Sequence, residues 1–288
     1  TSGAFTIASF DAGTNGISGK WSVTTGTSSN GNSGLVEVDS GEATSGRGGE
    51  FTFTVGATDT HDGGDFTLAG GDTSDAAAGG DVKAEAGPSS NAVGSLGGKV
   101  DIQGGVGAAK SGGYISVTTG KGTSTSSGTF TLQSSDAGDN GVSGSLTFNS
   151  GTATDVVGSG VITIDTGRST NGKGGSVLVT VGAGDTRHGG AVDAFAGEST
   201  VSSGGVMKLD SGFSTVTSSG SIEVNTDDAG ASGVSGAIFF ESGDAPAGDT
   251  GLMSLVSGSS AGGEGGSIRF DVGTGLSGEG GYVDMSAG

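Results

Sequence analysis

Residues 159–167 read Ser159-Gly160-Val161-Ile162-Thr163-Ile164-Asp165-Thr166-Gly167, and the pattern returns as Gly174-Gly175-Ser176-Val177-Leu178-Val179-Thr180-Val181-Gly182. In both stretches a Ser-Gly or Gly-Gly pair precedes alternating apolar residues, and a glycine ends the run. Strict alternation is typical of a strand buried on one side, because successive side chains point to opposite faces. We therefore expect each stretch to form one strand with its apolar side chains facing inward.

The pattern recurs every 15 or 16 residues throughout the sequence, with one longer interval between Gly79 and Gly97. A fixed short period is the signature of a solenoid. About nine residues of Gly, Ser, Thr, Asp, Asn and Ala separate successive strands, which is longer than a usual hairpin loop. The sequence therefore predicts an all-β fold. Within this class we favour a parallel β-solenoid (β-helix) of 15–16-residue one-strand units and not an antiparallel meander.

A longer motif bears on the number of units in one coil. The tripeptide Asp-Ala-Gly begins at Asp11, Asp136 and Asp228, and these copies are eight and then six units apart. Both spacings are even, so two units per coil would keep the copies on one wall, whereas three would not. One unit per coil is also compatible. We favour two units per coil, which would form two facing sheets about 10 Å apart.

The repeat also sets the expected domain organisation. We expect residues 1–288 to form a single continuous array, because the pattern has no interruption longer than the one interval above. Since the sequence starts and stops within the pattern, we interpret it as a piece of a longer repeat protein. End coils without caps expose unpaired strand edges, so continuation in a longer chain or end-to-end self-association is expected.

The composition limits the classes of partner. The net charge is −20, from 31 acidic and 11 basic residues, and this excess argues against nucleic acids and anionic membranes. No apolar run is long enough to span a bilayer. Cysteine is absent, which removes disulfides and thiolate metal sites. Cations, glycans and further copies of the protein remain as the expected partners.

Calcium is the one cofactor that the sequence suggests. Asp11, Asp136 and Asp228 recur at one position of the repeat, in turns rich in Asp, Asn and Gly, and oxygen ligands of this kind suit Ca²⁺. The simpler reading is that Asp, Asn and Gly are ordinary turn formers. His61 and His188 lie in related turns, and we interpret both as surface loop residues.

No catalytic constellation stands out, and we expect the protein not to be an enzyme. The carboxylates are scattered, arginine is scarce, and no phosphate-binding G-x-x-x-x-G-K-[S/T] motif occurs. The alternating apolar residues that are expected to face inward form one series along the repeat, which we call the inward series. A few large apolar residues do not fit it: Phe195, Phe213, Phe239 and Leu276. Where such residues cluster, we expect contacts between protomers.

The stretches 159–167 and 174–182 resemble the Gly/Ser/Thr/Asp-rich repeat regions of large secreted and cell-surface proteins of microalgae, notably diatoms. The resemblance covers the whole chain as a pattern. It implies an extracellular fibrous or adhesive role and carries over no catalytic residues.

Together these features predict an extracellular structural protein that forms a fibre, surface coat or adhesive through a Gly-rich acidic β-solenoid. The alternative is a ligand-binding module for ice, carbohydrate or mineral that uses a flat outer sheet. The outward positions mix Thr with charged residues such as Glu37, Lys208 and Arg269, and no unbroken Thr array appears.

Overall fold

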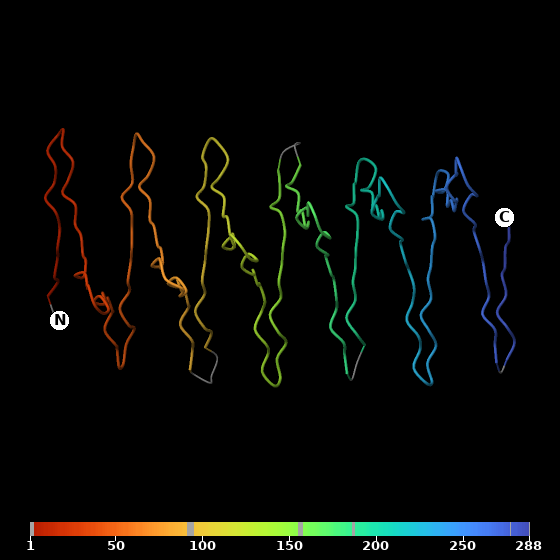
Figure 1. Ribbon diagram of the computed structural model, residues 1–288, viewed down its shortest axis with the longest axis horizontal. Helices are drawn as coiled ribbons and strands as arrows, with labels where there is room; N and C mark the ends of the chain where they lie inside the picture. Colours follow the sequence, from red (N-terminus) through yellow and green to blue (C-terminus); the bar gives the residue numbers. More distant parts are fainter. Residues whose placement is uncertain (1–2, 91–94, 155–157, 186–187, 277, 288) are drawn as a thin grey trace. The chain divides into compact units, whose positions relative to one another are not determined.

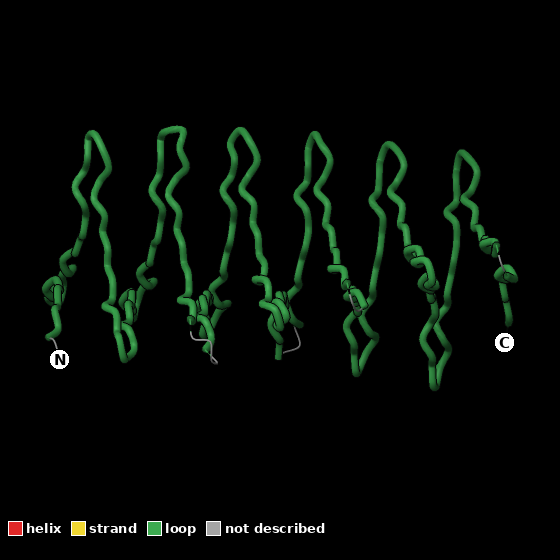
Figure 2. The backbone as a smooth tube through the Cα atoms, turned by 90° about the horizontal axis from the view of Figure 1, so that it is seen from below, coloured by secondary structure: helices red, strands yellow, loops and turns green. Residues whose placement is uncertain are grey.

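The structure is a computed structural model of the chain, and it describes residues 3–90, 95–154, 158–185, 188–276 and 278–287. In these ranges the backbone forms extended segments joined by turns and bends, without a helix or a β-strand (Figures 1 and 2). The chain divides into two units, Thr1–Thr147 and Phe148–Gly288. No helix of the described part has the length and apolar content needed to cross a bilayer.

The prediction of a parallel β-solenoid with two units per coil is therefore wrong. A sheet requires the backbone N–H and C=O groups of neighbouring segments to pair over several residues. The backbone–backbone hydrogen bonds of the described residues lie only within turns or across the ends of loops. The apolar alternation specifies an extended backbone with one apolar face. It does not specify that a neighbouring backbone lies within hydrogen-bonding distance, and in the described residues no ladder forms.

The loops between segments reverse the chain locally. The N–H of Gly128 donates to the carbonyl of Gly120 at 3.0 Å, and Gly205 donates to Gly197 at 2.8 Å. The same closure joins further glycine pairs, namely Gly71 with Gly80, Gly87 with Gly98, Gly105 with Gly113, and Gly212 with Gly220. Each of these loops brings the end of one extended segment beside the start of the next.

Other loops close through a side chain that lies against a glycine. The hydroxyl of Thr166 donates to the carbonyl of Gly175 at 3.4 Å, and Thr226 donates to Gly236 at 3.3 Å. At Gly190 the approach is tighter, because a Cβ there would lie 2.5 Å from Cγ1 of Val181. The second glycine of the Gly-Gly pair is thus required by close approach, and its missing side chain is what lets the segments meet.

The aromatic residues Phe53 and Phe66 show that their two consecutive segments keep one register. The rings of Phe53 and Phe66 lie 5.7 Å apart, and those of Phe51 and Phe53 lie 4.5 Å apart in an edge-to-face arrangement. Phe53 precedes Val55 by two residues and Phe66 follows Gly64 by two, while a Cβ on Gly64 would lie 2.8 Å from Val55. The register set at the loop therefore continues along both segments.

The exposure of the apolar side chains follows the alternation. From Ile7 to Val283 the large residues of the inward series range from 41% exposed at Val181 to 78% at Ile164, while the first and last members, Phe5 and Met285, are each 89% exposed. Every large apolar residue outside that series is at least as exposed as Leu35, at 80%. Apart from Phe5 and Met285 in the terminal segments, the two classes of described residues do not overlap, so the facing segments cover one side of each other and leave the other side open.

The described part of the chain nevertheless has no core. No side chain is buried, and the chain exposes 28838 Å². A compact monomer of 27.0 kDa exposes about 11,000 Å². Among the least exposed residues are those beside the loop closures, such as Ala86, Thr119 and Ser150. Burial is therefore concentrated where loops close, and the apolar rows between the loops stay half covered.

Candidate functional site

The three Asp-Ala-Gly copies form the same turn. In each copy the N–H of the final glycine donates to the carbonyl of the glycine three residues earlier: Gly16 to Gly13 at 3.2 Å, Gly141 to Gly138 at 3.1 Å, and Gly233 to Gly230 at 3.1 Å. This bond defines a β-turn whose central residues are Thr14-Asn15, Asp139-Asn140 and Ala231-Ser232. The recurring motif is thus a recurring local structure.

The calcium candidates Asp11, Asp136 and Asp228 each precede one of these turns and are exposed. Within the described residues no three His, Asp or Glu side chains come close enough to hold a metal ion. A calcium ion at such a turn would have one candidate carboxylate and would need backbone carbonyls or water for its remaining ligands. Calcium binding by these residues remains a prediction, and the turn geometry itself is accounted for by the glycine hydrogen bonds.

His61 is held within its own loop. The hydroxyl of Thr60 lies 2.9 Å from Nδ1 of His61, and the hydroxyl of Thr58 donates to the His61 carbonyl at 2.5 Å. Both histidines are exposed. These contacts are local and bring no acidic residue to the imidazole of His61, in keeping with its interpretation as a surface loop residue.

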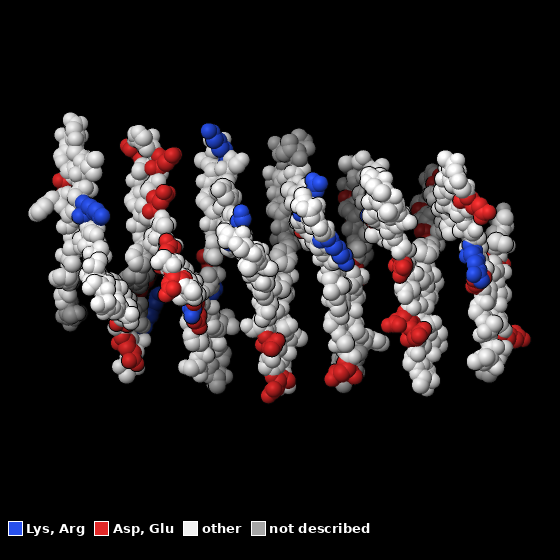
Figure 3. Space-filling model, viewed as in Figure 1, with Lys and Arg blue, Asp and Glu red and all other residues white. Residues whose placement is uncertain are grey.

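Three ion pairs lie along the outer faces of segments, and sequence reasoning did not pair them. Lys99 contacts Asp101 at 2.7 Å, Lys208 contacts Asp210 at 2.5 Å, and Arg269 contacts Asp271 at 2.6 Å. The signal was present, because residues two apart on an extended segment point to the same face. All six side chains are exposed, so each pair contributes little to stability. On the face seen in Figure 3 the remaining acidic side chains are distributed along the chain.

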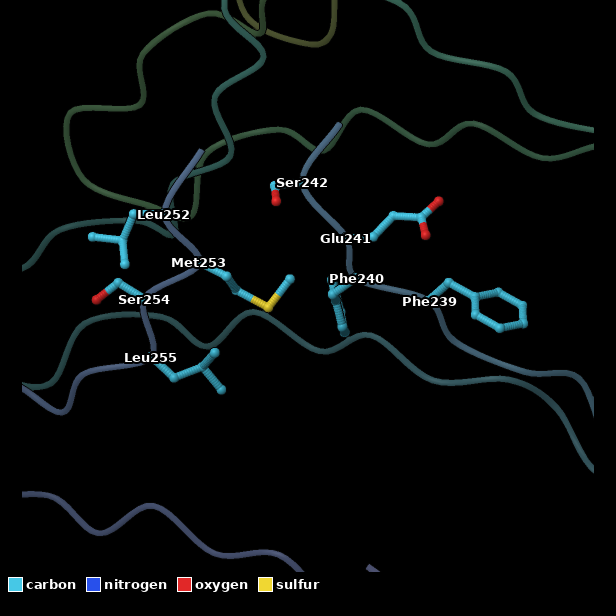
Figure 4. A pocket seen from close by; sticks show the side chains of 8 residues that line it. All are labelled: Phe239, Phe240, Glu241, Ser242, Leu252, Met253, Ser254 and Leu255. Atoms are coloured by element: carbon cyan, nitrogen blue, oxygen red, sulfur yellow. The ribbon is translucent and has the colours of Figure 1, made fainter. Parts of the chain in front are cut away.

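An open apolar groove lies in the second unit, between two consecutive segments. It has a volume of about 570 Å³ and is lined by Phe239, Phe240, Glu241 and Ser242 from one segment and by Leu252, Met253, Ser254 and Leu255 from the next. Figure 4 shows the side chain of Met253 directed toward Phe240, while Phe239 points away from the second segment. The groove can accept an apolar side chain and offers only one charged group, Glu241.

Sequence reasoning identified Phe239 as an outlier but missed the groove beside it. The missed signal is a break in the alternation. Residues 237–240 read Ala-Ile-Phe-Phe, and residues 252–256 read Leu-Met-Ser-Leu-Val, so both segments carry apolar residues on both faces. A continuous apolar run is typical of a segment that is covered on both sides.

No family model, no curated protein and no solved structure matches this chain.

Proposed function

We propose that this chain is an extracellular structural protein that associates with copies of itself into a fibre, surface coat or adhesive. The role is passive, with no catalytic step. The observation that carries the proposal is the half-covered apolar row: the inward side chains repeat along the whole chain, and none of those described is buried.

The physical reason is the cost of leaving apolar surface in water. Burying one Val, Leu, Ile or Phe side chain stabilises a structure by about 1.5–3 kcal/mol. The exposed area of 28838 Å² is more than twice the value expected for a compact monomer, so a large gain is still open to any process that covers these rows. A second copy carries the same rows with the same spacing.

The net charge makes association between copies depend on salt. With a net charge of −20, two copies repel each other at low ionic strength, and salt weakens that repulsion. The extracellular location rests on the resemblance to secreted microalgal repeats. The ligand-binding alternative relied on a flat outer sheet, which the described residues do not form, so we do not put it forward.

The test is sedimentation velocity together with electron microscopy, over a concentration series and with or without a Ca²⁺ chelator. We expect concentration-dependent assemblies that grow with salt. Dissolution on chelation would give the Asp-Ala-Gly turns a part in assembly. Short particles of constant mass at every concentration would refute the proposal.

A further inference from the structure

Asn-Gly pairs lie at four turns or bends of the described chain, and the proposed structural role uses none of them. They are Asn15-Gly16, Asn30-Gly31, Asn140-Gly141 and Asn171-Gly172. All four asparagines are exposed. Because glycine has no Cβ, nothing on it hinders the approach of its backbone nitrogen to the side chain of the preceding asparagine. This is the arrangement in which asparagine loses ammonia without an enzyme.

The reaction takes place between the two neighbouring residues. The backbone nitrogen of the glycine gives up its proton and attacks Cγ of the asparagine, and the side-chain amide leaves as ammonia, which closes a succinimide ring. Solvent water, the only co-reactant, then opens the ring at either carbonyl and gives aspartate or isoaspartate. The product carries a carboxylate where a neutral amide stood, and isoaspartate also lengthens the main chain by a methylene.

The hydrogen bond of the glycine N–H divides the four pairs into two kinds. In the Asp-Ala-Gly turns the N–H groups of Gly16 and Gly141 donate to the carbonyl three residues earlier, at 3.2 and 3.1 Å. Among the described residues, no backbone carbonyl accepts a hydrogen bond from Gly31 or Gly172. A bonded N–H must release its acceptor before the nitrogen can lose its proton and attack, so the hydrogen bond raises the barrier.

We propose that Asn30 and Asn171 are sites of spontaneous deamidation, and that the hydrogen-bonded turns protect Asn15 and Asn140. The net contribution of one hydrogen bond corresponds to an about two- to tenfold difference in rate. Each conversion adds a negative charge to a chain whose net charge is already −20. Ageing of the protein would therefore make the loops around Asn30 and Asn171 more acidic.

Asn15 and Asn171 form a matched pair within one molecule. Both stand in the tripeptide Thr-Asn-Gly, at residues 14–16 and 170–172, and both are exposed. The pairs differ in their backbone, because Asn15 lies in a hydrogen-bonded β-turn and Asn171 lies in a bend whose glycine N–H bonds to no described backbone carbonyl. A difference in their rates therefore reports the structure and not the adjacent residues.

The experiment incubates the full chain, dilute and in mildly alkaline buffer, and follows each site by tryptic digestion and mass spectrometry. Cleavage after Lys and Arg places the four pairs in different peptides: 1–20, 21–47, 122–168 and 169–173. We expect Asn171 to be converted about two- to tenfold faster than Asn15, and Asn30 faster than Asn140 by a similar factor. Equal rates within the matched pair, or no conversion at Asn171, would overturn the proposal.

Incubation in concentrated urea is the control, because it removes the turn and keeps the sequence. Asn15 and Asn171 should then react at equal rates, and a difference that persists in urea would overturn protection by the turn.

Gly172→Ala tests the ring closure. A Cβ there would meet the hydroxyl of Ser169 at 3.2 Å, a side-chain end that can rotate away. The variant should slow conversion at Asn171 and leave Asn15 unchanged, because the added methyl group hinders attack by the backbone nitrogen. An unchanged rate at Asn171 would overturn the succinimide route.

Discussion

The two units follow the same alternation but place their aromatic residues differently. In Thr1–Thr147 the ring of Phe53 contacts those of Phe51 and Phe66 on the inward side. In Phe148–Gly288 three phenylalanines lie outside the inward series and are exposed, namely Phe195, Phe213 and Phe239, whereas the first unit has one, Phe10. The same repeat can thus place large apolar groups on its inward or its outward side, and the side depends on whether the residue stands at an inward or an outward position of the alternation.

The outward positions of the segments sharpen this difference. In the first unit the middle outward residues are polar or charged: Thr6, Ser22, Glu37, Thr52, Thr67, Lys83, Asp101, Ser116, Thr131 and Thr147. In the second unit Leu178 and Phe239 occupy the same position. The other middle outward residues of the second unit are polar or charged, as in the first: Thr163, Asp193, Lys208, Glu223, Ser254, Arg269 and Asp284.

Both units share loops that close at a glycine. Substitution of such a glycine is expected to have the largest effect on stability. Gly190→Ala would place a Cβ 2.5 Å from Val181, and Gly64→Ala would place one 2.8 Å from Val55. We expect each change to lower the free energy of unfolding by about 1–3 kcal/mol, because the valine side chain or the loop backbone must shift to relieve the clash. Urea titrations followed by circular dichroism measure this loss.

The controls for that comparison are the preceding glycines. A Cβ on Gly63 or Gly189 would meet nothing within 4 Å. Alanine at either position should stabilise the protein by about 0.4–1 kcal/mol, because it restricts the unfolded chain. Equal effects at both glycines of a pair would show that close approach does not decide the loop.

A smaller effect separates inward from outward phenylalanines. Phe53→Ser removes ring contacts at 4.5 and 5.7 Å, and each aromatic pair contributes about 0.5–1.5 kcal/mol. We expect this variant to lower the free energy of unfolding, whereas Phe239→Ser, at a side chain that is 84% exposed, should change it by less than about 0.5 kcal/mol. Urea titration of the first unit can use the fluorescence of Trp21, the one tryptophan. A parallel loss of stability in both variants would contradict the distinction between the faces.

The ion pairs predict a still smaller effect in both units. Replacing Lys208 or Lys99 by Ser should change the free energy of unfolding by less than about 1 kcal/mol, because both partners of each pair are mostly exposed. The effect should fade as salt is added. A double-mutant cycle with Asp210→Asn measures the coupling, and a coupling that persists in high salt would refute a purely surface role.

The smallest expected effect concerns calcium at the turns. With one candidate carboxylate per turn, we expect dissociation constants on the order of 10⁻⁴–10⁻³ M, in the range of weak extracellular sites. Calorimetric titration of the wild type should show this binding, and the triple variant Asp11→Asn, Asp136→Asn, Asp228→Asn should lack it. Unchanged binding in the triple variant would move calcium away from these turns.

Particular residues show which structural features of this protein the sequence predicts. The alternation around Val36, Phe51 and Ile162 is matched by lower exposure of these side chains than of Leu35 or Val161. The Asp-Ala-Gly motif is matched by one β-turn in three places. The solenoid was predicted and is absent from the described residues, and the groove beside Phe239 was not predicted.

The sequence by itself determined the local features: extended segments, their apolar face, and loops that require glycine. These follow from parity along the chain and from the space around one residue, which a sequence contains. The tertiary structure alone decided whether neighbouring backbones pair, which loop ends meet through Gly128 and Gly120, and where Met253 and Phe240 leave a groove. These features depend on distances between residues of different segments, and a period of apolar residues sets their order but not their separation.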